Sequence, residues 1–245
     1  MTAPRERVVH ADVAALADDA AARLQAAAHA AVAARGRVVV ALSGGSTPRA
    51  LHARLVALGP DALPWRRTHV VFGDERCVPP DDAASNYGMA RDTLLAHVPV
   101  PAEQVHRMEG ERPPLDAARR YEARLRALAG ADDAAPFVDL LLLGMGADGH
   151  TASLFPGAPT LDERTRWVVP AEAPVGVTPR ERLTLTLPAL ARARTVLVLA
   201  AGAEKRAAVA RAEAEPADAP DALPVGRVRG RDATLWLLDA AAVAG

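Results

Sequence analysis

Short apolar runs alternate along the chain with longer segments that are polar on one side. The apolar runs predict strands at Arg37–Leu42, His69–Phe72, Gln104–Met108, Asp139–Leu143, Trp167–Val169, Arg182–Leu185, Thr195–Leu199 and Thr234–Leu238. The longer segments predict helices at Asp12–Ala34, Arg49–Leu58, Asn86–His97, Asp116–Leu128 and Glu204–Arg211. The strands are apolar at consecutive positions rather than at alternate ones, which indicates burial on both faces. The pattern therefore predicts an α/β fold, with a mostly parallel sheet covered by helices on both faces.

Turn residues separate these elements. After the first strand, Pro48 suits the first position of a helix, and Ser46 or Thr47 suits its N-cap. A second strand ends in a predicted turn at Gly73–Arg76, and Glu213–Pro224, rich in Pro, Ala and Asp, predicts a surface loop. Each strand, turn and helix in succession is the unit from which parallel sheets are built.

Composition limits the class of protein. The chain has 245 residues, of which 50% are hydrophobic and 24% charged, so we expect one globular domain over residues 1–245. Aromatic residues make up only 3%, so Ala, Val and Leu must build the core. The net charge is −1 and no basic cluster stands out, so we expect no nucleic-acid partner.

The chain also looks like a protein of a reducing, aqueous compartment. Its single cysteine, Cys77, cannot form an internal disulfide, and we expect it to be a buried packing residue. No apolar run approaches the roughly 20 residues that span a bilayer. The first apolar stretch contains acids and lacks the core of a signal peptide. We therefore expect a cytoplasmic protein without membrane contact.

One glycine pattern suggests a dinucleotide site. Gly144, Gly146 and Gly149 form a G-x-G-x-x-G motif directly after the most apolar strand. Such a motif must open a long helix whose N-terminus holds the pyrophosphate. Pro156 and Gly157 stop any helix within about two turns, and no acid ends a second strand at the required spacing. No Walker A lysine follows any of the glycine turns. The motif is therefore interpreted as a strand-end turn rather than as a cofactor site.

A second glycine turn has the composition of an anion site. It contains Ser43, Gly44, Gly45, Ser46 and Thr47. Small residues let backbone N–H groups approach an anion, the hydroxyls add donors, and the following helix directs its positive end toward the turn. Such a turn can also be merely a connection. Other polar segments follow predicted strands in the same way, at Asp74–Arg76, Asp148–His150 and Gly202–Lys205. Because strand ends meet at one edge of a parallel sheet, we expect these segments to form one site.

His150 is the strongest candidate catalyst among the histidines. An imidazole has a pKa of about 6.5 and exchanges protons near neutral pH. Asp148 could orient the ring, although a separation of two residues leaves direct pairing open, and both residues could instead cap a following helix. The remaining histidines are predicted to lie on helix surfaces, in loops or, for His69, in a structural position. Their spacing matches no metal-ligand motif, so we expect no metal.

Several segments together resemble a known family. They are SGGSTP (Ser43–Pro48), GDERCVP (Gly73–Pro79), SNYGMAR (Ser85–Arg91), GMGADGHTASLFPG (Gly144–Gly157), ERLTLTLPAL (Glu181–Leu190), GAEKR (Gly202–Arg206) and LWLLDAAA (Leu235–Ala242). Over nearly the whole chain they are similar to the 6-phosphogluconolactonase family. The resemblance implies a Rossmann-like fold of the deaminase, ribose-5-phosphate isomerase and CoA-transferase type. It also implies hydrolysis of 6-phospho-D-glucono-1,5-lactone to 6-phospho-D-gluconate in the oxidative pentose phosphate pathway, without a cofactor. We expect a monomer or a small homo-oligomer.

The resemblance also suggests residue roles. His150 would activate the water and then protonate the leaving ring oxygen, and Asp148 would orient it. Arg76 would stabilise the oxyanion or hold the phosphate, and Asp74 would position Arg76 or the sugar hydroxyls. The phosphate would be held by the turn Ser43–Thr47 together with Arg182 and Lys205.

Three alternatives are weaker. Glucosamine-6-phosphate deaminases, which are similar in fold, have a glutamate five residues after the histidine, where this chain has Phe155. They also tend to follow the Asp-Glu pair with an aromatic residue, where this chain has Arg76. Sugar-phosphate sensor domains carry a DNA-binding segment that we do not expect before Arg37. A nucleotide-binding domain is disfavoured by the helix break at Pro156.

Overall fold

The computed structural model describes residues 5–130, 135–219 and 221–243. Within them, six strands form a parallel sheet in the order β1-β9-β8-β5-β2-β3. These strands are β1 (Arg5–His10), β2 (Val38–Leu42), β3 (Thr68–Phe72), β5 (Val138–Gly144), β8 (Ala193–Ala200) and β9 (Ala233–Asp239). Three shorter strands form an antiparallel sheet in the order β4-β7-β6: β4 (Asp74–Arg76), β6 (Val168–Glu172) and β7 (Glu181–Leu185).

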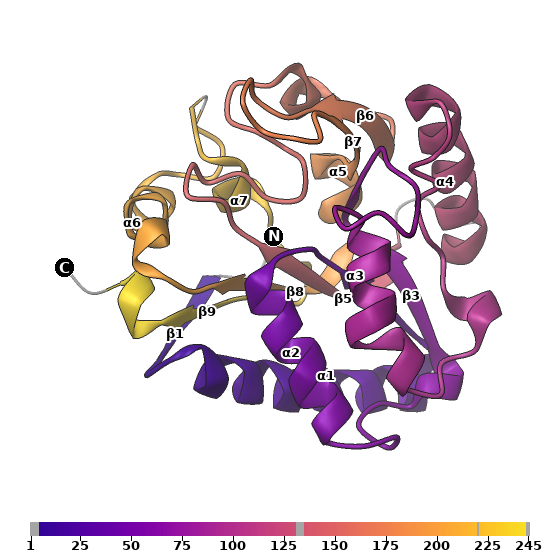
Figure 1. Ribbon diagram of the computed structural model, residues 1–245. Coiled ribbons are helices and arrows are strands. Elements are labelled where there is room, and N and C mark those ends of the chain that lie inside the picture. Colours follow the sequence, from indigo (N-terminus) through magenta and orange to yellow (C-terminus); the bar gives the residue numbers. More distant parts are fainter. Residues whose placement is uncertain (1–4, 131–134, 220, 244–245) are drawn as a thin grey trace.

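Helices cover both faces of the large sheet (Figure 1). The α-helices are α1 (Val13–Arg35), α2 (Ser46–Ala57), α3 (Asn86–Thr93), α4 (Pro114–Ala129), α5 (Leu187–Leu190), α6 (Arg206–Ala214) and α7 (Pro224–Arg227). Short 3₁₀ helices lie at Trp65–Arg67, Leu95–His97, Ala102–Gln104, Pro159–Asp162, Ala203–Lys205 and Ala240–Ala242. No helix among the described residues is long and apolar enough to cross a membrane. The predicted fold class, a mostly parallel α/β fold with helices on both faces, is confirmed.

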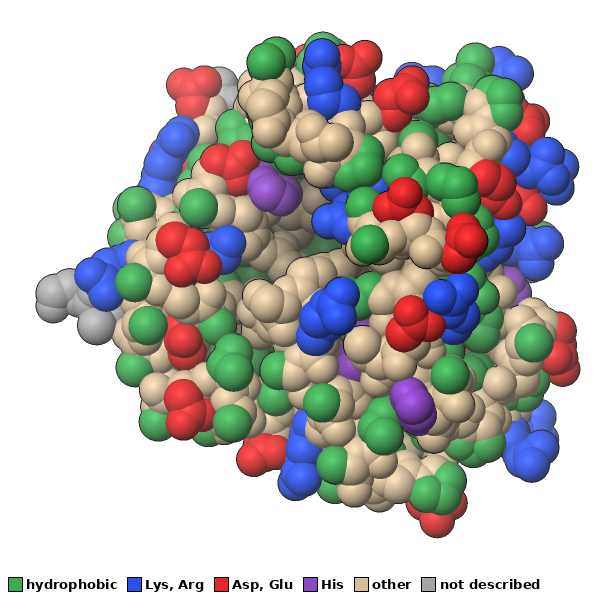
Figure 2. Space-filling view, viewed as in Figure 1, with side chains coloured by type: hydrophobic (Ala, Val, Ile, Leu, Met, Phe, Trp, Pro, Cys, Tyr) green, Lys and Arg blue, Asp and Glu red, His purple; other side chains and the backbone are tan. Residues whose placement is uncertain are grey.

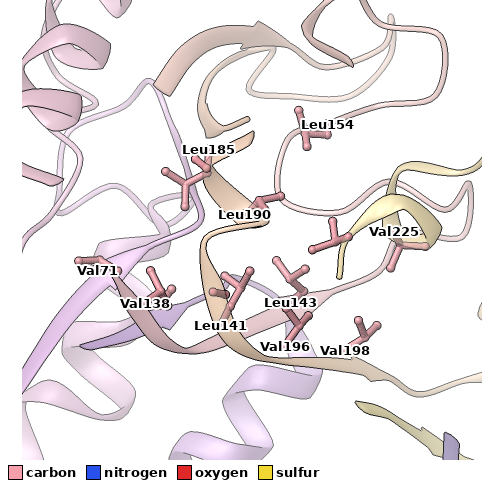
Figure 3. Packing of buried hydrophobic residues seen from close by; sticks show 14 of the residues in the cluster. Val71, Val138, Leu141, Leu143, Leu154, Leu185, Leu190, Val196, Val198 and Val225 are labelled. Carbon is pink, nitrogen blue, oxygen red and sulfur yellow. The ribbon is translucent and has the colours of Figure 1, made fainter. Parts of the chain in front are cut away.

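The continuous apolar strands serve two cores. In β2, Val40 and Leu42 face the core under α1, α2 and α3, whereas Val39 and Ala41 face the opposite core. The opposite core is closed by α4, α6, α7 and the small sheet. Figure 3 shows part of it, where side chains of β5 and β8 meet those of Leu185 and Val225. Since successive residues of a strand point to opposite faces, burial on both faces requires an apolar residue at every position.

Several local predictions are wrong. Strand β1 was not expected because its first three residues are charged, yet it pairs in parallel with β9 at the edge of the sheet. Gln104–Met108 is not a strand, since only one isolated bridge, between Val70 and Val105, forms there. The predicted turn at Gly73–Arg76 contains strand β4, which pairs with β7. Strand β7 pairs with β4 on one side and with β6 on the other, so the predicted strands that contain β6 and β7 belong to the small antiparallel sheet and not to the large one.

Helix boundaries also differ from the predictions. Helix α2 begins at Ser46 rather than at Arg49, and its N-cap is Gly45, which forms no side-chain cap. The helix predicted over Asn86–His97 ends at Thr93, and a separate 3₁₀ helix follows at Leu95–His97. The last predicted helix begins as a 3₁₀ turn at Ala203–Lys205 before α6. The earlier start of α2 brings Ser46 and Thr47 into its first helical turn.

Candidate active site

A pocket lies at the carboxyl edge of the large sheet, where β2, β5 and β8 end. Every residue that the sequence predicted for the site lines this pocket, except Asp148. In Figure 2 the pocket is a hollow with a histidine and several basic side chains around its rim. The strand-end segments therefore meet at one pocket, as the sequence predicted, whereas the roles of their residues stay predictions.

Asp148 lies directly behind the imidazole of His150. The Oδ1 atom of Asp148 is 2.6 Å from Nδ1 of His150 and also accepts a hydrogen bond from the His150 backbone N–H at 3.1 Å. Burial raises the pKa of Asp148, but these hydrogen bonds outweigh it and hold that pKa below its usual range. A carboxylate at Nδ1 fixes the tautomer that carries its proton there, which leaves Nε2 as the proton acceptor. The direct pairing that the sequence left open is present.

Two neighbours fix the plane of the imidazole. The ring of Phe155 lies against it, with centroids 4.7 Å apart and an interplanar angle of 44°. On another side the backbone of Gly146 is so close that an added Cβ would lie 2.1 Å from Nδ1 of His150. Pairing to Asp148, contact with Phe155 and the close approach of Gly146 together hold the ring at the pocket wall.

The turn between β2 and α2 presents donors without acceptors. Gly45 adopts φ 113°, a conformation that favours glycine, and α2 begins at the next residue. The first N–H groups of a helix have no acceptor within it, and the helix dipole makes this end attractive to anions. The hydroxyl of Ser43 is buried without a hydrogen-bond partner. Lys205 lies across the pocket, and its ammonium is 3.8 Å from Glu204.

Two arginines lie side by side on adjacent strands of the small sheet. Arg76 on β4 and Arg182 on β7 are direct cross-strand partners. Burial lowers the pKa of Arg182, and the nearby charge of Arg76 lowers it further. Nε of Arg76 is buried without a partner, whereas its Nη1 donates to the carbonyl of Ala84 at 2.5 Å. Like charges placed opposite each other destabilise a sheet, so this pair is suited to an anionic ligand.

Asp74 is held by two residues for which the sequence suggested no role. Its Oδ1 accepts from Nδ2 of Asn86 at 3.0 Å, and its Oδ2 accepts from Oγ of Ser153 at 2.7 Å. All three side chains are buried. Both partners lie inside motifs that carried the family resemblance, SNYGMAR and GMGADGHTASLFPG, but only tertiary structure brings them to the carboxylate.

The sequence suggested no role for Glu75 either. Its carboxylate is buried and accepts from the backbone N–H groups of Arg76, Asn86 and Tyr87 and from the hydroxyl of Ser85. Burial raises the pKa of Glu75, and the backbone hydrogen bonds oppose that rise. The carboxylate therefore ties β4 to the first turn of α3, and this tie places Asn86 beside Asp74.

Two histidines outside the site are buried, and for one of them, His52, the prediction is wrong. His52, predicted to lie on a helix surface, is fully buried, with Nδ1 2.8 Å from the hydroxyl of Thr93. Burial, followed by the charge of Arg49, lowers the pKa of His52 to about 4. His106 is buried as well, and its Nε2 is 3.1 Å from Nδ1 of His69. Neither His52 nor His106 lines the pocket.

Cys77 lies beside Arg76 but is partly exposed and packs against the core. Burial raises the pKa of its thiol to about 11, and Glu181 and Glu75 add to the rise. Thiolate is the nucleophilic form, so this cysteine is poorly suited to nucleophilic catalysis. In the parts of the chain that the structure describes, no group of three or more His, Cys, Asp or Glu residues is arranged to hold a metal ion.

Comparisons with known proteins point to the same family as the sequence motifs. A family model described as "Glucosamine-6-phosphate isomerases/6-phosphogluconolactonase" matches residues 11–236. The 6-phosphogluconolactonase of Mycobacterium tuberculosis is 43% identical over 229 residues, which cover 91% of this chain and 90% of that protein. The chain belongs to the 6-phosphogluconolactonase family.

Other 6-phosphogluconolactonases support this assignment. The protein of Rattus norvegicus is 43% identical over 214 residues, which cover 85% of this chain and 80% of that protein. The crystal structure of the 6-phosphogluconolactonase from Thermotoga maritima matches with a TM-score of 0.82 and 29% identity, over 96% of this chain and 100% of that one. The family resemblance that the sequence motifs predicted is confirmed.

Proposed function

We propose that the chain hydrolyses 6-phospho-D-glucono-1,5-lactone to 6-phospho-D-gluconate, a reaction of the oxidative pentose phosphate pathway. We infer the reaction from the enzyme name that the relatives share, 6-phosphogluconolactonase. The observation that carries it here is the His150–Asp148 pair, at 2.6 Å, beside a pocket that also holds basic side chains and unpaired donors. A lactone is an activated ester, so one positioned base and one water suffice.

The phosphate of the substrate is assigned to the turn before α2. Ser43, the first amides of α2, Lys205 and Arg182 all line the pocket. A charge-assisted hydrogen bond contributes about 1.5–3 kcal/mol, so several of them would select a phosphorylated lactone over a neutral one. The buried, unpartnered hydroxyl of Ser43 supports this assignment, because buried polar groups usually have partners.

In the proposed mechanism, Nε2 of His150 removes a proton from water as the water oxygen attacks the lactone carbonyl. The carbonyl π electrons move to oxygen and give a tetrahedral intermediate. When the intermediate collapses, the bond between C1 and the ring oxygen breaks, and the imidazolium returns its proton to that oxygen. The product is the open-chain acid, and Asp148 stabilises the imidazolium between the two steps.

Arg76 is assigned to the developing oxyanion. The phosphate already has Lys205, Arg182 and the turn as partners, and Nε of Arg76 has none in the protein. Asp74 is assigned to the sugar hydroxyls, because its partners are Asn86 and Ser153 rather than Arg76. A carboxylate has about four acceptor positions, so two hydrogen bonds leave capacity for a ligand.

Phe155 supports hydrolysis over the deaminase reaction. Its ring lies against the catalytic imidazole, at the position where deaminases have a glutamate for ring opening. A hydrocarbon ring cannot transfer a proton.

The test follows the disappearance of freshly generated 6-phosphogluconolactone against its spontaneous hydrolysis. We expect His150→Ala to lower kcat/KM by about 10²–10⁴-fold with an unchanged circular dichroism spectrum. His97→Ala, at an exposed histidine outside the pocket, is the matched control and should keep full activity. A wild-type protein that does not exceed the spontaneous rate would refute the function. A loss of less than about tenfold in His150→Ala would refute its role as base.

A further inference from the structure

We propose that Ser153 is a positioning residue, which acts on the reaction by holding the Asp74 carboxylate and joining it to the loop that carries His150. This inference rests on the proposed function, because it assigns a task to a residue that the proposed mechanism does not use.

Ser153 occupies a closed position between three segments. It is fully buried, and its hydroxyl donates to Oδ2 of Asp74 at 2.7 Å across 79 residues of sequence. Its backbone N–H donates to the hydroxyl of Thr184 at 3.1 Å. Thr184 is itself the direct cross-strand partner of Asp74 in the β4–β7 pair. Ser153 therefore contacts both members of one rung of the small sheet.

The same serine fixes the loop that presents the base. It lies three residues after His150, and between them Ala152 adopts φ 50°, a conformation that non-glycine residues rarely adopt. Such a backbone persists only where its surroundings determine it. On one side of Ala152 the hydroxyl of Thr151 donates to the carbonyl of Gly144 at 2.8 Å, and on the other side Ser153 makes its two hydrogen bonds. Ala152 itself lines the pocket.

The hydrogen bond between Ser153 and Asp74 favours a role in orienting the Asp74 carboxylate. The Asp74 carboxylate is buried and receives two neutral donors, from Ser153 on one oxygen and from Asn86 on the other. Fixing both oxygens also fixes the direction in which the remaining lone pairs can accept substrate hydroxyls. Loss of the serine hydroxyl would leave one oxygen of the carboxylate without its donor.

The test is a double-mutant cycle on Ser153→Ala and Asp74→Ala with 6-phosphogluconolactone as substrate. If Ser153 acts through Asp74, Ser153→Ala lowers kcat/KM about tenfold in the wild-type background, as expected for one hydrogen bond to a charged group. In the Asp74→Ala background the same change should then alter kcat/KM by less than about twofold. The dissociation constant of 6-phosphogluconate, measured by calorimetry on the same four proteins, gives a second cycle if Asp74→Ala turns over too slowly.

Thr234→Val is the matched control. Thr234 is buried and its hydroxyl accepts from the backbone N–H of Gly230, but it lies at the beginning of β9, away from the pocket. Thr234→Val and Ser153→Ala should both lower the melting temperature, because each removes a buried hydrogen bond, but Thr234→Val should leave kcat/KM within about twofold.

An equal effect of Ser153→Ala in both backgrounds would overturn the proposal, as would full activity of Ser153→Ala alone. A wild-type protein without lactonase activity would refute the proposed function instead. In that case the calorimetric cycle still decides whether Ser153 and Asp74 act together.

Discussion

Gly44 is a position where a single methyl group should disable the pocket. It lies in the turn between β2 and α2, and its φ is not in the left-handed region, so its backbone conformation does not exclude alanine. An added Cβ, however, would lie 2.0 Å from Oδ1 and 2.7 Å from Cγ of Asn86. Asn86 cannot move away freely, because its Nδ2 donates to Asp74 and its backbone N–H donates to Glu75 at 2.6 Å.

The cost of Gly44→Ala follows from these contacts. Overpacking a closed site costs about 1–3 kcal/mol, and a buried carboxylate that loses a donor adds about 1–3 kcal/mol. A combined loss of about 2–6 kcal/mol corresponds to a fall of roughly 4–24 °C in melting temperature for a chain of this size. If the clash moves the turn or the Asp74 carboxylate by about 1 Å, kcat/KM falls by about 100-fold.

The assay is thermal unfolding followed by circular dichroism, together with lactonase kinetics on the same preparations. Gly73→Ala is the matched control, because Gly73 also lies beside the site and its added Cβ would meet only the carbonyl of Leu42, at 3.6 Å. It should retain the wild-type melting temperature and activity. If Gly44→Ala also retained both, Asn86 would not be held as rigidly as its hydrogen bonds imply, and the reasoning would be wrong.

Three further predictions concern single residues. Lys205→Ala should raise KM for the phosphorylated lactone by about tenfold or more, because one charge-assisted contact is lost; an unchanged KM would exclude Lys205 from the phosphate site. The pKa of His52 is lowered to about 4 in the folded protein, below about 6.5 in the unfolded chain, so the unfolded state binds more protons and stability falls as the pH drops from about 6.5 to about 4. Urea unfolding at pH 7 and pH 4.5 should show this acid loss reduced by about 2–3 kcal/mol in His52→Gln, and an equal loss in both proteins would contradict the assignment. Cys77→Ser should leave kcat within about twofold, since a thiol with its pKa raised to about 11 is not the nucleophile; loss of turnover in a folded variant would overturn that reading.

The sequence predicted the parts of the fold that follow from local patterns. Runs such as Val38–Leu42 are apolar at every position because both faces of the large sheet are buried. The strand-end segments met at one edge because parallel strands place their carboxyl ends there. The convergence of Ser43–Thr47, His150 and Lys205 could therefore be inferred without a structure.

What the sequence could not predict depends on pairing between distant segments. Strand β4 is three residues long and charged, and it is a strand only because β7 pairs with it. The hydrogen bond between Ser153 and Asp74 joins residues 79 positions apart, which no local pattern encodes. A polar side chain such as that of His52 is expected on a helix surface, but the packing of α2 against α3 buries it.

The site residues also fall into two groups, those that the sequence could predict and those that it could not. His150 stands out by its chemistry and Asp148 by its proximity in sequence, so both could be predicted. Asn86 and Ser153 carry common polar side chains inside longer motifs, and their relevance is set by the buried carboxylate that they contact.

The most direct test of the account is the ratio of kcat/KM for 6-phosphogluconolactone to that for unphosphorylated gluconolactone. In the proposed function the pocket recognises a lactone through its phosphate, using several charge-assisted contacts. The expected preference for the phosphorylated lactone is therefore at least about 10³-fold. Equal values for the two lactones would contradict it.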